Sequence, residues 1–128
     1  MDTVSDTARI AAAEAYLDAL VSHDADAVPF ASDCVRVENG LKTGFSGNHL
    51  RRSLNRGPQY RLLKEIADRE FTVVGDEVRA AFTVVLKVKV KVGGRRVVAH
   101  TEETFVIPAS DGMIHHIHAQ VRPRLRRD

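Results

Sequence analysis

The sequence predicts an α+β domain in which N-terminal helices cover one face of a curved antiparallel sheet. Helical periodicity is confined to the first 57 residues, alternating strand patterns fill the rest of the chain, and turn dipeptides separate those strands. The chain has 128 residues, of which 44% are hydrophobic and 28% charged. This is the composition of one folded domain. We expect a single domain over residues 1–128, with residues 1–6 and 122–128 as tails.

The first helix is expected over residues 7–22. One side of this segment carries apolar residues at helical spacing, namely Ile10, Ala13, Leu17 and Leu20, with Tyr16 beside them. Asp6 or Thr7 can cap its start. The segment is therefore an amphipathic helix whose apolar side we expect to pack on the sheet.

Three further elements are expected before residue 58. They are a short helical turn through residues 24–30, an extended strand over residues 34–39, and a second helix over residues 46–57 that Gly57 closes. The strand ends at Asn39-Gly40, a dipeptide typical of turns.

Residues 69–122 predict an antiparallel meander. Turns are expected at Gly75-Asp76, Gly93-Gly94 and Asp111-Gly112, and the strands between them alternate apolar and polar residues. In the second strand, one apolar row contains Phe82, Val84, Leu86, Val88, Val90 and Val92, whereas lysines interrupt the other row. That pattern is typical of a sheet with one buried and one solvated face.

Composition also bears on location and partners. The first residues lack the apolar core of a secretory signal, the single cysteine cannot form an intrachain disulfide, and no apolar run approaches the roughly 18 residues that span a bilayer. We therefore expect a cytoplasmic protein without membrane contact. Residues 1–50 carry a formal charge of −5 and residues 51–128 one of +7, but only 5% of residues are aromatic and none is tryptophan. Because stacking residues are scarce, we do not expect nucleic acid as a partner.

Four stretches resemble a known family: AEAYLDALVSHDADAVPFASDCVRVENG, AAFTVVLKVKV, VVAHTEETF and GMIHHIHAQV. They are similar to the ketosteroid isomerase and polyketide cyclase (SnoaL-like) group of the nuclear transport factor 2-like superfamily, which has a cystatin-like fold. The resemblance covers about residues 8–121. It implies a cone-shaped sheet wrapped by helices, a pocket inside the cone, and a homodimer formed through the outer face of the sheet.

The segment 95–107 places an acid on an otherwise apolar row. Alternation puts Glu103 and Thr101 on one face with Val97, Ala99, Phe105 and Ile107. Burial raises the pKa of a carboxyl, and a neutral carboxylic acid can donate a hydrogen bond. The resemblance implies that Glu103 and Tyr16 together form the oxyanion hole of a ketosteroid isomerase. The alternatives are that Tyr16 only packs its ring on the sheet, and that Glu103 forms an ion pair with a basic residue on a neighbouring strand.

The segment MIHHIHAQVR, residues 113–122, holds three of the six histidines. Its apolar row contains His115, which is expected to face the core or the pocket as a hydrogen-bonded core residue or as a base. His116 and His118 share the other row and have the spacing of metal ligands, but no third ligand is placed near them. We expect them to be solvated or at the dimer interface, and we expect no metal and no cofactor.

The general base implied by the resemblance is an aspartate, and Asn39 stands in its place. Alternation puts Asn39 on the inward row with Val35 and Val37, which leaves Arg36 and Glu38 pointing outward. Because an amide cannot abstract a proton, the chemistry would require that a bulge turns Glu38 inward or that the histidine at 115 acts as the base. Epoxide hydrolysis would require paired aspartates around an arginine, and the Phe82, Val84 and Leu86 row supplies none.

Two hypotheses about function follow. In the first, the chain is an isomerase, cyclase or lyase acting on a small apolar carbonyl compound: Tyr16 and Glu103 stabilise the oxyanion, and His115 or Glu38 moves the proton. In the second, the cavity binds a ligand without chemistry, or the chain is a dimeric interaction module. The residues expected to bind the ligand are Asn39, Phe82, Val84, Leu86, Thr101, Phe105, Ile117 and Ala119.

Overall fold

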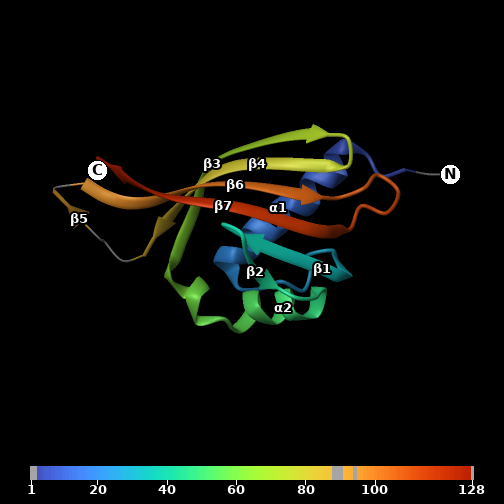
Figure 1. Ribbon diagram of the computed structural model, residues 1–128, viewed down its shortest axis with the longest axis horizontal. Coiled ribbons are helices and arrows are strands. Elements are labelled where there is room, and N and C mark those ends of the chain that lie inside the picture. Colours follow the sequence, from blue (N-terminus) through green and yellow to red (C-terminus); the bar gives the residue numbers. More distant parts are fainter. Residues whose placement is uncertain (1–2, 88–90, 94, 128) are drawn as a thin grey trace.

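The computed structural model describes residues 3–87, 91–93 and 95–127 and has the expected α+β architecture (Figure 1). In chain order the elements are α1 (Asp6–Ser22), β1 (Phe30–Glu38), β2 (Leu41–Gly44), α2 (Gly47–Arg56), the 3-10 helix η1 (Pro58–Leu62), β3 (Leu63–Val74), β4 (Glu77–Leu86), β5 (Lys91–Val92), β6 (Arg95–Val106) and β7 (Ile114–Arg126). The predictions for residues 88–90 and 94 lie outside the described residues. No helix in the described ranges combines the length and the hydropathy that a membrane span requires.

Hydrogen bonds hold the chain in place just before α1. The expectation of a tail over residues 1–6 is therefore wrong for residues 4–6. Ser5, rather than Asp6 or Thr7, caps the helix: its Oγ accepts a hydrogen bond from Ala8 N at 3.1 Å. One residue earlier, Val4 N donates to Ala109 O at 2.7 Å. The chain is therefore anchored to the loop before β7 ahead of the first helical turn.

A buried arginine fastens α1 to the sheet. Arg9 is only 3% exposed, and its Nε donates to Ile107 O at 2.6 Å while its Nη2 donates to Gly75 O at 2.7 Å. Asp6 pairs with Nη1 at 3.3 Å. Since these two carbonyls follow β6 and begin the β3–β4 turn, one side chain holds the helix and two strand ends together.

The sheet has the strand order β2-β1-β7-β6-β4-β3, and β5 pairs with β6. Strands β3, β4, β6 and β7 form the predicted antiparallel meander. In contrast, β1 runs parallel to β7 and forms a hairpin with β2. The sequence pattern did not indicate β2, because three of its four residues are exposed. The expected helical turn over residues 24–30 is a non-helical turn, and β1 begins at Phe30.

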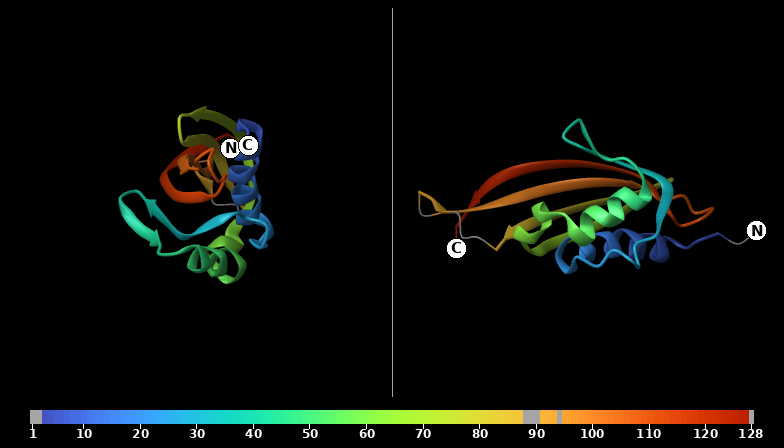
Figure 2. Two further views of the ribbon diagram at one scale, coloured as in Figure 1. Left: turned by 90° about the vertical axis from the view of Figure 1, so that its right-hand side faces the viewer. Right: turned by 90° about the horizontal axis from the view of Figure 1, so that it is seen from below.

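The sheet curls around α1 and the core (Figure 2). Its strand pairing is irregular at several places, among them between Phe30 and Val35 on β1 and between Ala67 and Glu70 on β3, where Asp68 has a φ of 57°. The helix α1 packs on β3 and β4, and α2 packs on β1. The apolar side chains enclosed between them form a single core.

The ribbon of β6 and β7 is longer than the sequence indicated. β7 continues to Arg126, which pairs with Arg96, so residues 122–126 are a strand and not part of a tail. Figure 1 shows the first part of β6 and the last part of β7 extending past both helices toward β5. One end of the sheet therefore has no helix beneath it.

Candidate functional site

A pocket of about 320 Å³ opens on the inner side of the curved sheet. The polar side chains that line it are Arg36, Glu38, Thr43, Thr101 and Glu103. Its apolar wall consists of Leu20, Tyr60, Leu63, Phe82, Val84, Leu86, Ala99 and Val121. The pocket thus combines an apolar wall with a small polar group concentrated on β1 and β6, the usual composition of a small-molecule site.

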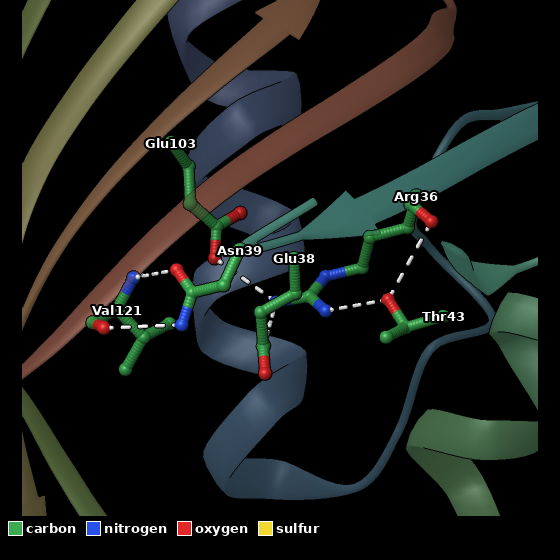
Figure 3. A network of polar contacts seen from close by, with 6 residues as sticks. All are labelled: Arg36, Glu38, Asn39, Thr43, Glu103 and Val121. Atoms are coloured by element: carbon green, nitrogen blue, oxygen red, sulfur yellow. Dashed lines mark hydrogen bonds and ion pairs between the residues drawn. The ribbon is translucent and has the colours of Figure 1, made fainter. Parts of the chain in front are cut away.

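Arg36 joins two carboxylates of the pocket lining (Figure 3). Its Nη2 lies 2.9 Å from Glu38 Oε1 and 3.6 Å from Glu103 Oε1. Its Nη1 donates to Thr43 Oγ1 at 2.9 Å, which brings the β1–β2 hairpin into the cluster. The four side chains form one connected group, which we call the Arg36 cluster. Glu103 therefore forms an ion pair, as the alternative from the sequence has it, but its partner lies on β1, which β7 separates from β6, and not on a neighbouring strand.

The expectation that Arg36 and Glu38 point outward is wrong. The side chains of Cys34 and Arg36 are buried and Glu38 lines the pocket, whereas Val35 and Val37 are half-buried on the other row. The two valines made the Val35 and Val37 row the more apolar one, so alternation indicated the wrong inner face. The ionic partners of Arg36 are what allow a charge to occupy the buried row.

Asn39 lies outside the pocket, contrary to the expectation. Its backbone is left-handed with a φ of 48°, and its side chain is exposed. The side chain pairs with the backbone of Val121 twice: Nδ2 donates to the carbonyl at 3.2 Å, and Oδ1 accepts from the amide at 2.9 Å (Figure 3). Asn39 therefore extends the β1–β7 ladder by one side-chain pair, a structural position next to the pocket.

Glu103 titrates close to neutral pH. It is 3% exposed, and burial raises the pKa of its carboxyl to about 7, an effect that Arg36 opposes and Glu38 reinforces. Burial alone would lower the pKa of Arg36, but Tyr16, Glu103, Tyr60 and Glu38 raise it. The cluster therefore keeps its arginine charged while one of its two acids exchanges a proton near pH 7.

Tyr16 lies behind the Arg36 cluster and not on the pocket wall. The side chain is fully buried, with its ring edge-on to Phe30 and Phe105 at centroid distances of 6.1 and 5.5 Å. Burial raises the pKa of its hydroxyl well above the ordinary value, Arg36 opposes that rise, and Glu103 adds to it. Tyr16 is therefore a neutral phenol, and it lies close enough to the Arg36 cluster for the charges there to shift its pKa. Three other residues expected to bind ligand, Phe105, Ile117 and Ala119, are also fully buried core residues outside the pocket lining.

Several buried polar atoms around the cluster have no hydrogen-bond partner among the described residues. They are Tyr16 Oη, Arg36 Nε, Thr101 Oγ1 and Glu103 Oε2. Most buried polar side-chain atoms in folded proteins are hydrogen-bonded, so four unpartnered atoms around one pocket are unusual. Those of Arg36, Thr101 and Glu103 belong to residues that line the pocket, so the polar atoms of a ligand can satisfy them.

His115 belongs to a different depression, so the structure does not bring it together with Tyr16 and Glu103. Its Nε2 lies 2.7 Å from Asp111 Oδ2, and its Nδ1 lies 3.8 Å from Asp33 Oδ1. A backbone hydrogen bond from Met113, followed by the bond to His115, lowers the pKa of Asp111. The expectation that His115 faces the core or the pocket is therefore wrong. At the irregular start of the β1–β7 ladder, Ile114 is buried and His115 is half exposed.

The other two histidines of this strand lie on the outer face, as alternation predicts. His116 pairs with Val106 and His118 with Thr104, on the row away from the pocket. Within the described ranges, no group of three or more histidine, cysteine, aspartate or glutamate side chains is arranged to hold a metal ion.

Among the polar side chains of the pocket, the sequence did not indicate Arg36 and Thr43. Both depend on contacts that alternation does not encode: the irregular β1–β2 pairing between Arg36 and Val37, and the ion pairs that permit a buried guanidinium. The one available signal was the Arg36-x-Glu38 pair, two opposite charges on the same row of the strand.

Solved structures with this fold include enzymes and proteins named by family alone. An LEH-like epoxide hydrolase from M. tuberculosis is 23% identical, with a TM-score of 0.68 over 91% of this chain and 84% of its own. A putative isomerase of the SnoaL-like family from Agrobacterium tumefaciens is 13% identical, with a TM-score of 0.66 over 91% of this chain and 98% of its own. A putative polyketide cyclase from Sinorhizobium meliloti is 23% identical, with a TM-score of 0.62 over 86% and 94%.

These likenesses establish the fold alone, which the chain shares with SnoaL-like and NTF-2 like proteins. No curated protein matches the sequence. A family described as a domain of unknown function, DUF8021, matches residues 2–121. The chain belongs to the DUF8021 family.

Proposed function

We propose that the pocket binds a small, largely apolar carbonyl compound and moves a proton on it, as an isomerase or lyase does. The observation that carries this proposal is the fully buried Glu103, whose carboxyl has a pKa of about 7 and faces a second carboxylate across Arg36. A carboxyl buried in an apolar pocket with a pKa near 7 is a usual means of acid–base catalysis near neutral pH.

The proposed roles follow from the positions of the groups. Glu38 is 38% exposed at the pocket and takes a proton from the carbon next to the carbonyl. The electron pair of the broken C–H bond moves to the carbonyl oxygen, which accepts a hydrogen bond from protonated Glu103. Glu38 then returns the proton to another carbon, and the oxygen becomes a carbonyl again. Tyr16 lies behind the cluster as a neutral phenol, and Arg36 holds the two acids in place.

A second candidate function has a specific observation in its favour. Epoxide hydrolysis would require two carboxylates around one arginine. The row of Phe82 on β4 does not supply them, but Glu38 and Glu103 lie on either side of Arg36. In epoxide hydrolysis, Glu38 would take a proton from the attacking water, and Glu103 would protonate the epoxide oxygen as its C–O bond breaks. Formation of a diol from styrene oxide, lost in Glu38→Gln, distinguishes this reaction from isomerisation.

The experiment that tests the proposed site is calorimetric binding of 2-naphthol, a planar mimic of an oxyanion. We expect binding below about pH 7, where Glu103 donates, and weaker binding above it. Glu103→Leu should weaken binding by about 1–3 kcal/mol, the cost of losing a buried hydrogen bond, and Tyr16→Phe by less.

The matched control is Glu102→Gln, which changes an exposed acid on the outer row of the same strand. Equal binding by wild type and Glu103→Leu would remove the proposed donor. Absence of binding by the wild type would favour the dimeric interaction module over an enzyme.

We also propose that the chain forms a homodimer through the outer face of the sheet. What supports this is the distribution of charge on that face: β6 and β7 carry Arg96, Arg122 and Arg124 toward one end, and Glu102 with Glu70 of β3 toward the other. An antiparallel pair of chains would place unlike charges together. Sedimentation at a mass twice 14.2 kDa would support the dimer, and a mass of 14.2 kDa would contradict it.

A further inference from the structure

The apolar inner row of β6 and β7 continues beyond the pocket. The register pairs Thr101 with Val121 at the pocket wall, then Ala99 with Pro123, and then Val97 with Leu125. Because every second residue of a strand points to the same face, these three pairs form one continuous strip. The strip begins beside the Arg36 cluster, and its side chains beyond Thr101 are all apolar.

This strip has no helix beneath it at its far end. Figures 1 and 2 agree that the first part of β6 and the last part of β7 extend past α1 and α2. Leu125 is 49% exposed there, one of the few large apolar side chains of the described chain that remain open to solvent. From Thr101 to Val97 the strip is four residues long, roughly 13 Å at the rise of a strand.

The opposite face of the same ribbon has a different character. Arg122, Arg124 and Arg126 point away from the strip, because they alternate with Val121, Pro123 and Leu125. Only the inner face is therefore both apolar and continuous with the pocket. The charged side chains that could bind a polar molecule lie on the opposite face of the ribbon.

We propose that this strip binds the hydrocarbon tail of the ligand whose polar head occupies the pocket. The inference rests on the proposed function, and it identifies the substrate class as an elongated amphipath, a carbonyl compound with an unbranched or lightly branched apolar chain. Continuity with the pocket selects a ligand tail as the occupant, since head and tail lie along one row of side chains. An uncharged tail also suits this strip, because the side chains of its two outermost pairs, Ala99 with Pro123 and Val97 with Leu125, are all apolar.

The test is the affinity of a series of 4-n-alkylphenols, from methyl to octyl, for the wild type, Leu125→Gln and Arg124→Gln. The two variants change adjacent residues on opposite faces of the ribbon, and both positions are exposed, so neither change disturbs the core. We expect affinity to rise about three- to fourfold for each added methylene, as burial of hydrocarbon predicts. Leu125→Gln should remove the gain from the longest tails and leave 4-methylphenol unaffected, and Arg124→Gln should leave the whole series unchanged.

Affinity that stays flat as the chain lengthens, or equal behaviour of the two variants, would overturn the inference. A parallel series of 1-alkanols separates this failure from that of the proposed function. If the alkanols bind with the same dependence on Leu125 while 4-methylphenol does not bind, the tail strip stands and the proposed oxyanion site is wrong. If 4-methylphenol binds but chain length has no effect, the site stands and the tail strip is wrong.

Discussion

At the scale of single residues, the site depends on which of two neighbours on β1 enters the pocket. Glu38 enters and pairs with Arg36, whereas Asn39 turns out into a left-handed conformation and pairs with Val121. The resemblance had placed the usual base at Asn39, but the carboxylate available to a ligand is one residue earlier. A change of one residue in strand position reverses the face, which is why the sequence did not settle the point.

Asn39→Asp tests this assignment. Although the substitution recreates the residue that the resemblance implies, we expect it to add no proton-transfer activity, because position 39 is outside the pocket. It should cost about 1 kcal/mol of unfolding free energy, since the new carboxylate cannot donate to the carbonyl of Val121. Chemical denaturation measures the cost, and hydrogen exchange at the α-carbon of a cyclic enone measures the activity. A gain in exchange rate would show that position 39 faces the ligand.

At the scale of elements, the inner face of β6 was predictable, whereas that of β1 was not, although a strand over residues 34–39 was expected. On β6, the row from Thr101 to Ile107 is buried as the pattern indicated, because only one row of that strand is apolar. On β1, valines lie on one row and cysteine and arginine on the other, so hydrophobicity pointed to the wrong face. The ion pairs that reverse the choice join β1 to β6, segments that are distant in sequence, and no local pattern records them.

The attachment of α1 to the sheet gives a prediction at this scale. Arg9→Ala should lower the free energy of unfolding by roughly 2–4 kcal/mol, because it leaves the carbonyls of Gly75 and Ile107 without their buried donor. Arg52→Ala, on the exposed side of α2, is the matched control and should change stability by less than about 0.5 kcal/mol. Equal effects of the two substitutions in urea denaturation would show that the Arg9 contacts are not important for stability.

At the scale of the whole molecule, the buried acid links stability to pH. The pKa of Glu103 is 4.5 in an unfolded chain and about 7 in the folded one, so between these values the folded state holds a proton that the unfolded state has lost. This contribution is fully present below about pH 4.5 and declines until about pH 7, by roughly 3 kcal/mol in total.

Glu103→Gln should abolish that decline, since glutamine imitates the protonated acid and does not titrate. Relative to the wild type, the variant should therefore gain stability as the pH rises from about 5 to about 8. Urea denaturation of both proteins across this range measures the difference. Parallel curves would mean that Glu103 has the same pKa in both states.

The general architecture was accessible from sequence because it rests on patterns that repeat along the chain. The helices, the meander and the inward position of Glu103 all follow from periodicity. The pocket chemistry was less accessible, because Arg36 and Thr43 enter it through pairing between separate strands and His115 leaves it through an irregular ladder.

A titration of the Glu103 carboxyl by carbon-13 NMR of the glutamate-labelled protein tests the site directly, with Glu103→Gln to identify the resonance. Glu103 should remain largely protonated below neutral pH beside the charged Arg36. We expect a midpoint near pH 7 for that resonance. A midpoint near the ordinary value of 4.5 would contradict this expectation and would leave the pocket without its proposed hydrogen-bond donor.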